Sequence, residues 1–535
     1  MAFNDDEKPS ASNTGRTKGL VTIKPAKYFK DDAALTADTV TAEVEINATS
    51  STAVREGLDL VAVLDVSGTM AEEKLESMKR AMAFVIMKLT PVDRLSIVTF
   101  SEGATRRNPL RSVTAAAQDD LKALVNGLEA RGPTNIRAGL ETGLAVLAGR
   151  VHTKARTANI FLMSDGHQNA GDNAGDVDPG QVTVYSFGFG QHTDHKLMSD
   201  IARRSPGGTF SSVPDGSQAS VPFSQLLAGL LTVVAQDVEL TFTPNPKTDP
   251  SEVGDTDTIE VARGTDYTTI PDAATSGKIT IKFGTLFAGE GRRVVITLKL
   301  KDVSDKFEEE EYDATLAEAQ HSFTAQGRPK DPQVPQDIQI RRTPSPSQAP
   351  GESSKAREVQ AEIARRNHAE AIRQARELAD AGELEEAGYK LVEAQNALED
   401  IVVDRLDDGK KLVSSLRAEL AQLLKLMETK ELYEAQGRAY ALASETCHGR
   451  QRYAARGGGG DDDVRLYTTP RMDTYRKQAK NFEENPTAPV PTADEDLKQE
   501  ILANPISAVS TELAYHLRMA IQSLQAIERI VAPSN

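Results

Sequence analysis

Two hydrophobic patterns alternate along the chain and predict where strands and helices lie. In the segment 40–47, Val, Ala, Val and Ile alternate with Thr, Glu, Glu and Asn, which is typical of an antiparallel strand with one buried face. The segment 58–65, LDLVAVLD, is almost continuously apolar, as in a parallel strand that is covered on both faces. The two neighbouring segments therefore predict two different kinds of sheet.

Strands and helices alternate over the part of the chain from about 56 to 236. After the first apolar run, Leu75, Met78 and Met82 recur at helical spacing between Lys and Glu residues. Further apolar runs, RLSIVTF, ANIFLMSDG and VTVYSFGFG, are separated by amphipathic segments. This alternation predicts a doubly wound α/β domain over 56–236.

Short β-branched strands lie on both sides of this domain. VELTFTP, GKITIKFGTL and RRVVITLKLKDV follow residue 237 and are separated by Gly, Pro and Asp turns. The simplest interpretation is one split β-sandwich, formed by 18–55 and 237–342, with the α/β domain inserted in it.

The remaining segments are polar or helical. We expect residues 1–17 to be disordered and the Pro/Ser-rich segment 343–354 to be a linker. Within the linker, Thr343 and Ser345 each precede a proline and match a proline-directed phosphorylation motif, although a flexible spacer explains the same composition.

The C-terminal part, 355–535, is rich in Ala, Glu and Arg and predicts a helical domain. Gly382 stands where one helix ends and an antiparallel helix begins. A third helix is expected near 409–444 and a last one near 510–531, with a flexible Gly/Asp loop at 457–463. The fold class is therefore multidomain α/β + β + α.

Composition narrows the classes of function. The net charge is -17 and the pI about 5.1, which opposes nucleic-acid binding, since that needs clustered Lys and Arg. Cys447 is the single cysteine, so the chain can form no internal disulfide and no zinc ribbon, and we expect Cys447 and His448 to be structural or solvent-exposed. We see no secretory signal and no transmembrane segment, which favours a cytoplasmic location with peripheral membrane association left open.

Oxygen-bearing side chains gather where the predicted parallel strands end. Asp65, Ser67 and Thr69 follow the first buried strand, Thr134 precedes a helix, and Asp165 ends another buried strand. Ligands of open α/β sheets bind outside the carboxyl ends of the strands, so these side chains form a candidate site. Such hard donors favour Mg²⁺, with Mn²⁺ or Ca²⁺ as alternatives, over zinc.

Other interpretations of these residues are weaker. Asp and Ser at a strand end often cap a helix. DVSGT also approaches the start of a phosphoryl-transferring hydrolase, but Ser67 stands where that chemistry needs a second Asp as acid/base. His167 and His192 are expected in loops near the site, without a metal role.

DVSGT, with Thr134 in PTN and Asp165 in SDG, resembles the metal-ion-dependent adhesion site of von Willebrand factor type A domains. In that pattern Asp-x-Ser-x-Ser is followed by a distant Thr and a distant Asp, and Thr69 here retains the hydroxyl of the second Ser. The resemblance implies Mg²⁺-dependent capture of an acidic group on a protein. It places Ser67, Thr69 and Thr134 near the ion, with Asp65 and Asp165 sometimes acting through water.

A wider resemblance covers most of residues 20–480. MKRAMAFVIMKL, DRLSIVTFS, SPGGTFS and ELYEAQGRAYALAS are similar to plant proteins related to the wavy-growth RING-type ubiquitin ligases. Those ligases carry an N-terminal RING finger, which needs several cysteines, whereas this chain has one. The resemblance thus implies a relative without the RING finger, to which ligase activity does not carry over.

Together these observations predict a non-enzymatic interaction protein whose metal site binds an Asp or Glu of a protein partner. The alternative is a substrate-binding or regulatory component of a ubiquitin ligase pathway, acting with a RING-type relative. A metal-dependent hydrolase is a remote third possibility, because the expected general base is missing.

Overall fold

The structure is a computed structural model, and it is described here over most of the chain. The described residues are 7–11, 19–51, 55–191, 193–216, 218–244, 255–262, 264–272, 277–307, 310–330, 333–347, 351–399, 401, 408–457, 464–503, 513, 516–517, 520–521 and 523–524. The predictions for most of residues 1–17, for His192, for the Gly/Asp loop and for much of the last helix fall outside these residues.

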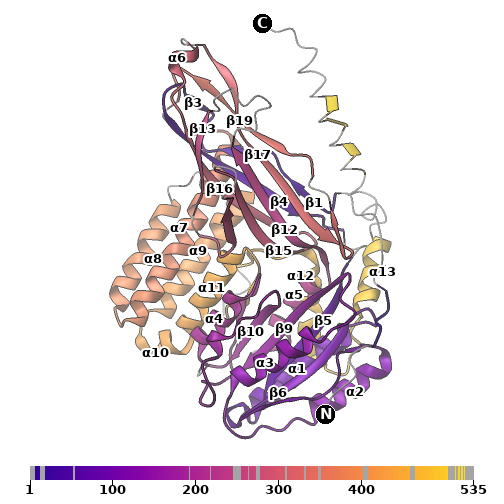
Figure 1. Ribbon diagram of the computed structural model, residues 1–535. Coiled ribbons are helices and arrows are strands. Elements are labelled where there is room, and N and C mark those ends of the chain that lie inside the picture. The colour runs from indigo at the N-terminus through magenta and orange to yellow at the C-terminus, as the bar shows by residue number, and fades with distance from the viewer. Residues whose placement is uncertain are drawn as a thin grey trace.

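A mainly parallel sheet forms the centre of the α/β domain, at the lower right in Figure 1. Its strand order is β11-β10-β9-β5-β6-β7, with β8 also paired to β6. The strands are β5 (Gly57–Asp65), β6 (Arg94–Phe100), β7 (Ala104–Arg106), β8 (Arg111–Ser112), β9 (Arg156–Ser164), β10 (Thr183–Phe189) and β11 (Phe210–Val213). Every residue of β5, β6 and β10 is buried, as the continuously apolar runs predict.

Helices cover both faces of this sheet and divide its core in two. One cluster of buried side chains joins the sheet to α1, α2 and α5, and another joins it to α3 and α4. The helices are α1 (Glu73–Lys88), α2 (Ala115–Asn126), α3 (Ile136–Ala148), α4 (His195–Arg204) and α5 (Ser220–Leu230), with short 3-10 turns η1 (Gly68–Met70) and η2 (Ala174–Asp176).

Two largely antiparallel sheets enclose a third core above the α/β domain (Figure 1). One sheet has the order β1-β4-β16-β13 with β2 on β4, and the other β14-β15-β12-β17-β19-β3 with β18 on β17. The elements are β1 (Val21–Ile23), β2 (Lys27–Tyr28), β3 (Asp32–Ala34), β4 (Asp38–Ala48), β12 (Val233–Pro244), β13 (Thr256–Val261), β14 (Thr268–Pro271), β15 (Ile279–Phe287), β16 (Gly291–Leu300), α6 (Ser304–Phe307), β17 (Tyr312–Ala325), β18 (Arg328–Lys330) and β19 (Gln336–Thr343).

Strand β4 shows why segments far apart in sequence belong to one sandwich. It pairs with β16 along its whole length, from Asp38 opposite Leu300 to Asn47 opposite Gly291. The α/β domain lies between β4 and β12 in sequence. Thr343 ends β19 and is buried, with its Oγ1 donating to Glu311 Oε1 at 2.8 Å, whereas Ser345 is exposed.

The C-terminal part is helical; α7 to α11 lie at the left in Figure 1, whereas α12 lies beside α5 of the α/β domain and α13 at the right. The prediction of a single helix near 409–444 is wrong. Helix α9 ends at Leu426, and the next helical turn starts after Thr429, whose side chain caps it by accepting a hydrogen bond from Leu432 N. Gly382, at φ 88°, follows α7 as predicted. The helices are α7 (Ser354–Asp380), α8 (Leu384–Glu399), α9 (Asp408–Leu426), α10 (Lys430–Leu432), the π-helical turn η3 (Tyr433–Gly437), α11 (Arg438–Arg450), α12 (Pro470–Glu484) and α13 (Ala493–Ala503).

A buried ion pair joins the three parts. Arg452, just after α11, donates to both carboxylate oxygens of Glu290 at 2.9 and 2.8 Å, and Glu290 lies between β15 and β16 of the sandwich. The same guanidinium donates to Tyr185 Oη of the α/β sheet at 3.2 Å. The structure thus confirms the predicted class, α/β plus β plus α. Among the described residues, the search for a helix long and apolar enough to cross a membrane finds none.

Candidate metal centre

The candidate site lies at the carboxyl ends of β5 and β9, which are parallel neighbours with Leu64 opposite Met163. Asp65, the last residue of β5, is fully buried. Its Oδ1 accepts the backbone N–H of Ser67 at 2.8 Å, and its Oδ2 accepts the hydroxyl of Ser164 at 2.6 Å. These two bonds fix the carboxylate at the sheet rim.

The hydroxyls of the loop after β5 connect this strand to Asp165. Ser67 Oγ lies 3.0 Å from Thr69 Oγ1, and Thr69 Oγ1 donates to Asp165 Oδ1 at 2.8 Å. Hydrogen bonds therefore link four of the five predicted residues: Asp65, through the backbone of Ser67, and then Ser67, Thr69 and Asp165.

Thr134 reaches the same place from the loop before α3. The loop is held by Gly132 O, which accepts from Gly68 N at 2.8 Å, and by Thr134 N, which donates to Asn169 Oδ1 at 2.8 Å. A Cβ placed on Gly166 would lie 3.1 Å from Thr69 Oγ1 and 3.2 Å from Thr134 Oγ1. Both hydroxyls therefore lie against the same glycine.

The donor set fits a hard divalent cation. Thr134 is only 1% exposed, and its Oγ1 has no hydrogen-bond partner among the described residues. A buried hydroxyl without a hydrogen-bond partner destabilises the folded protein. A cation bound to the lone pair of Thr134 Oγ1 would remove that cost. Hydroxyl and carboxylate oxygens are the ligands that Mg²⁺, Mn²⁺ and Ca²⁺ prefer.

Both carboxylates of the site, Asp65 and Asp165, are buried, and burial changes the pKa of Asp65. Burial raises the pKa of Asp65 to about 6, although hydrogen bonds from Ser164 and Ser67 act in the opposite direction. The charge of Asp165 raises the pKa of Asp65 further. The ammonium of Lys74, in the first turn of α1, lies 2.5 Å from Asp165 Oδ2.

Four contributors to this site were missed from the sequence: Ser164, Gly166, Asn169 and Lys74. Ser164 and Gly166 flank Asp165 in the SDG motif, and their position beside a candidate ligand was the available signal. Asn169 and Lys74 act from a loop and a helix, where nothing in the hydrophobic pattern marks them.

A cavity of about 720 Å³ adjoins the site between the α/β domain and the helical part. His167 and Thr193 line it on one side, and Glu434 and Arg438 on the other. Thr193 Oγ1 lies 3.3 Å from the backbone oxygen of Asp165, so the cavity opens directly beside the site.

A second group of metal-ligating side chains lies inside the helical part. His368 of α7 and His448 of α11 both place Nε2 against Glu419 Oε2 of α9, at 2.7 and 2.8 Å. Cys447 and His448 are both fully buried, so solvent exposure is wrong, and the prediction that they form no ligand set overlooked the place of His448 in this group. This cluster could not be predicted from the hydrophobic pattern, because its three members come from separate helices.

The protonation pattern of His368, Glu419 and His448 favours hydrogen bonding between the three helices over metal binding. We call this hydrogen-bonded group the lock. Arg365 Nη1 lies 3.5 Å from His448 Nδ1, and since a guanidinium can only donate, that nitrogen accepts. Nε2 of His448 then carries the proton that Glu419 accepts, and it has no lone pair for a metal. Burial alone would raise the pKa of Glu419, but Arg456, 2.7 Å away, and the two imidazoles hold it well below its usual value.

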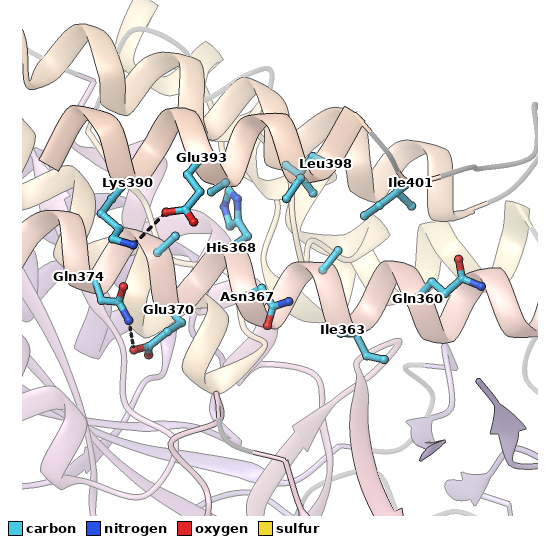
Figure 2. A pocket seen from close by; sticks show the side chains of 14 residues that line it. Gln360, Ile363, Asn367, His368, Glu370, Gln374, Lys390, Glu393, Leu398 and Ile401 are labelled. Carbon is cyan, nitrogen blue, oxygen red and sulfur yellow. Dashed lines mark hydrogen bonds and ion pairs between the residues drawn. The ribbon is translucent and has the colours of Figure 1, made fainter. Parts of the chain in front are cut away.

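His368 also borders a groove of about 450 Å³ between α7 and α8 (Figure 2). Figure 2 shows its imidazole between the two helices, with the Lys390–Glu393 ion pair at 2.9 Å along the α8 side. Alanines and the apolar side chains of Ile363, Leu398 and Ile401 form much of the remaining lining. The groove is separate from the rim of the parallel sheet, because none of the five predicted site residues lines it.

Comparison with known families agrees with the fold. Residues 59–225 match the family described as von Willebrand factor type A domain, and residues 410–481 match the family described as VWA / Hh protein intein-like. The chain is therefore a protein with a von Willebrand factor type A domain, a module of protein–protein interaction or adhesion.

Its relatives include two plant ubiquitin ligases. The chain is 29% identical to the E3 ubiquitin-protein ligase WAV3 of Arabidopsis thaliana over 265 residues, which is 47% of this chain and 32% of that protein. It is 30% identical to the probable E3 ubiquitin-protein ligase WAVH2 of the same plant over 255 residues, 46% of this chain and 33% of that protein. The chain thus matches about a third of the length of these two relatives.

A solved structure has a similar fold. The von Willebrand factor type A protein from Catenulispora acidiphila covers 76% of this chain and 91% of its own length, with a TM-score of 0.56 and 18% identity. This likeness establishes the fold, and function has to be argued from the site.

Proposed function

We propose that this protein captures an acidic group of a protein partner through a divalent ion at Asp65, Ser67, Thr69, Thr134 and Asp165. The observation that carries the proposal is the unpartnered, buried Thr134 Oγ1, which faces the same glycine as Thr69 Oγ1. Mg²⁺ is the ion that we favour, with Mn²⁺ or Ca²⁺ as alternatives, because all five donors are hard oxygens.

Each residue has a distinct task in this proposal. Ser67, Thr69 and Thr134 would hold the ion through neutral hydroxyls, while Asp65 and Asp165 would orient those hydroxyls and balance the charge. When bound, the ion supplies an electrophilic position that a carboxylate of the partner can fill. No proton transfer is needed, so the protein acts without catalysis, and a cytoplasmic location is part of the proposal.

Thr134→Val tests the proposal, because it removes one oxygen and keeps the side-chain shape. We expect the full chain to bind Mg²⁺ in a calorimetric titration and Thr134→Val to bind it at least about tenfold more weakly, for loss of one of few ligands. Thr241→Val is the control, since Thr241 pairs with Thr280 in the sandwich, away from the site. Equal Mg²⁺ binding by wild type and Thr134→Val would contradict the proposal.

A second candidate is a substrate-binding or regulatory component of a ubiquitin ligase pathway. It is supported by the identity with WAV3 and WAVH2 over nearly half of this chain. In that case the acidic partner would be a ligase substrate or a RING-type relative. An ubiquitination assay with a purified RING-bearing relative tests this: addition of this protein should change the rate or the substrate, and Asp65→Ala should abolish the change.

A hydrolase remains the least supported function. At the position where an acid/base carboxylate would stand, Ser67 instead pairs its hydroxyl with Thr69.

A further inference from the structure

The Lys74–Asp165 ion pair is the one feature of the site that its proposed function does not require. Lys74 Nζ lies 2.5 Å from Asp165 Oδ2. The carboxylate side chain is fully buried, whereas the lysine side chain is 22% exposed. The ammonium therefore reaches from the surface onto a buried oxygen of the candidate metal centre.

The local helix does not explain this lysine. Lys74 is the second residue of α1, and a positive charge in the first turn opposes the helix macrodipole. Glu73 and Glu76 in the same turn follow the usual preference for acidic residues. The favourable contact of Lys74 is the one to Asp165, so its role belongs to the site.

We propose that Lys74 tunes the coupled binding of the ion and the partner carboxylate: it weakens binding of the ion alone and strengthens binding of the carboxylate to the ion-loaded site. This inference rests on the proposed function and adds a regulation of the same site. The ammonium neutralises half of the negative charge of the site, which weakens the attraction for a divalent ion bound alone.

The charge balance gives the physical reason. Near neutral pH the two carboxylates and the ammonium give the site one net negative charge. A divalent ion leaves one net positive charge in a buried, low-dielectric place, where unbalanced charge is unfavourable. A carboxylate from the partner restores neutrality, so ion and partner each raise the affinity for the other, by the same factor.

Without Lys74 the ion and the carboxylate still attract each other, but the ion binds alone more tightly and the loaded site holds the carboxylate more weakly. Two carboxylates and a divalent ion are already neutral, and a further carboxylate adds unbalanced negative charge. The lysine thus makes the site fill when ion and acidic partner are both present, and stay weakly occupied when the ion is alone.

Lys74→Met is the direct test, and Lys79→Met is its matched control. Lys79 lies on the same helix and pairs with Glu76 at 2.9 Å, away from the five site residues. Mg²⁺ is titrated calorimetrically into each full-length protein, with and without a fixed concentration of N-acetyl-aspartate N-methylamide as the carboxylate probe. The corresponding asparagine amide controls for the rest of the probe, and circular dichroism verifies folding.

We expect Lys74→Met to bind Mg²⁺ alone at least roughly tenfold more tightly than wild type, the scale of the repulsion between a divalent ion and an ammonium about 6 Å apart at the dielectric constant of water. The aspartate probe should tighten Mg²⁺ binding by wild type and by Lys79→Met, and should tighten it less in Lys74→Met, where the loaded site is already neutral. Lys74→Arg, which keeps the charge, should behave as wild type does.

The outcomes separate this inference from the function on which it rests. If wild type and Lys74→Met bind Mg²⁺ equally and respond equally to the probe, the coupling is wrong and the metal site stands. If neither protein binds Mg²⁺ at all, the proposed function fails and the coupling with it. Binding by Lys74→Met alone would support the role of Lys74 as the cation that keeps the site empty.

Discussion

At the residue scale, the candidate site depends on close approach of small side chains. Thr69 and Thr134 come from different segments, and the hydroxyls of both lie close to the position that a Cβ on Gly166 would occupy. A glycine is needed at this place because any side chain would enter the space between the two hydroxyls. The SDG motif thus contributes a carboxylate, Asp165, and the room in which an ion would lie.

Gly166→Ala should therefore weaken metal binding while leaving the fold intact. The added methyl group would lie 3.1 Å from Thr69 Oγ1 and 3.2 Å from Thr134 Oγ1, so both hydroxyls would have to move. We expect Mg²⁺ affinity to fall at least about tenfold, on the scale of other changes next to a metal site, with a small change in melting temperature. Gly103→Ala is the control, since nothing lies within 4 Å of its added Cβ. Undiminished Mg²⁺ binding by Gly166→Ala would show that the ion, if bound, lies elsewhere.

At the scale of elements, the sequence predicted those parts that depend on local pattern. Continuous apolar runs identified the parallel strands, and their carboxyl ends identified the rim where Asp65 and Asp165 lie. The break between α9 and α10 was missed, because the apolar spacing continues across it and the restart depends on one capping hydroxyl, that of Thr429. Lys74 was missed as part of the site, because its partner lies 91 residues away in sequence.

The lock formed by His368, Glu419 and His448 could not be predicted from the sequence either, because its members lie on three separate helices. It predicts that the free energy of unfolding depends on pH. Burial lowers the pKa of His448 to about 4 in the folded protein, although Glu419 acts in the opposite direction. Because this is below the ordinary value near 6.5, the unfolded chain binds more protons than the folded chain between these two pH values. The stabilisation by neutral His448 is complete above pH 6.5 and is lost as the pH falls toward 4.

His448→Gln should make the free energy of unfolding less dependent on pH in this window. From pH 7 to pH 4.5 the free energy of unfolding should fall more steeply for wild type than for the variant. The difference in slope should correspond to the uptake of about one proton on unfolding, as measured by urea unfolding at several pH values. His152→Gln, at a half-buried position whose backbone oxygen accepts from Arg94, is the control. Parallel pH profiles for wild type and His448→Gln would contradict the protonation pattern derived for the lock.

At the scale of the whole molecule, the three parts meet on buried charges. Glu290 of the sandwich accepts from Arg452 of the helical part and from Arg292 of its own sheet, the latter at 2.9 Å. Burial alone would raise the pKa of Glu290, but the two guanidinium groups hold it below its usual value. Through Arg452 this carboxylate also contacts the α/β domain at Tyr185 Oη, so one buried group orients the domain that carries the candidate site.

Glu290→Gln should loosen this junction without touching the metal centre. The change leaves two buried guanidinium groups without their carboxylate, and removal of one partner from a buried ion pair costs roughly 3–5 kcal/mol. Because the protein has several parts, the effect should appear as a lower urea midpoint of the first unfolding transition and as faster proteolysis between the parts. Glu260→Gln, which breaks the exposed pair with Lys299, should shift that midpoint little, since exposed ion pairs contribute about 0–1 kcal/mol.

If Mg²⁺ binding survives in Glu290→Gln while the first transition moves, the α/β domain carries the site by itself and the junction sets its orientation. An unchanged first transition would instead mean that apolar packing, and not this ion pair, holds the three parts together.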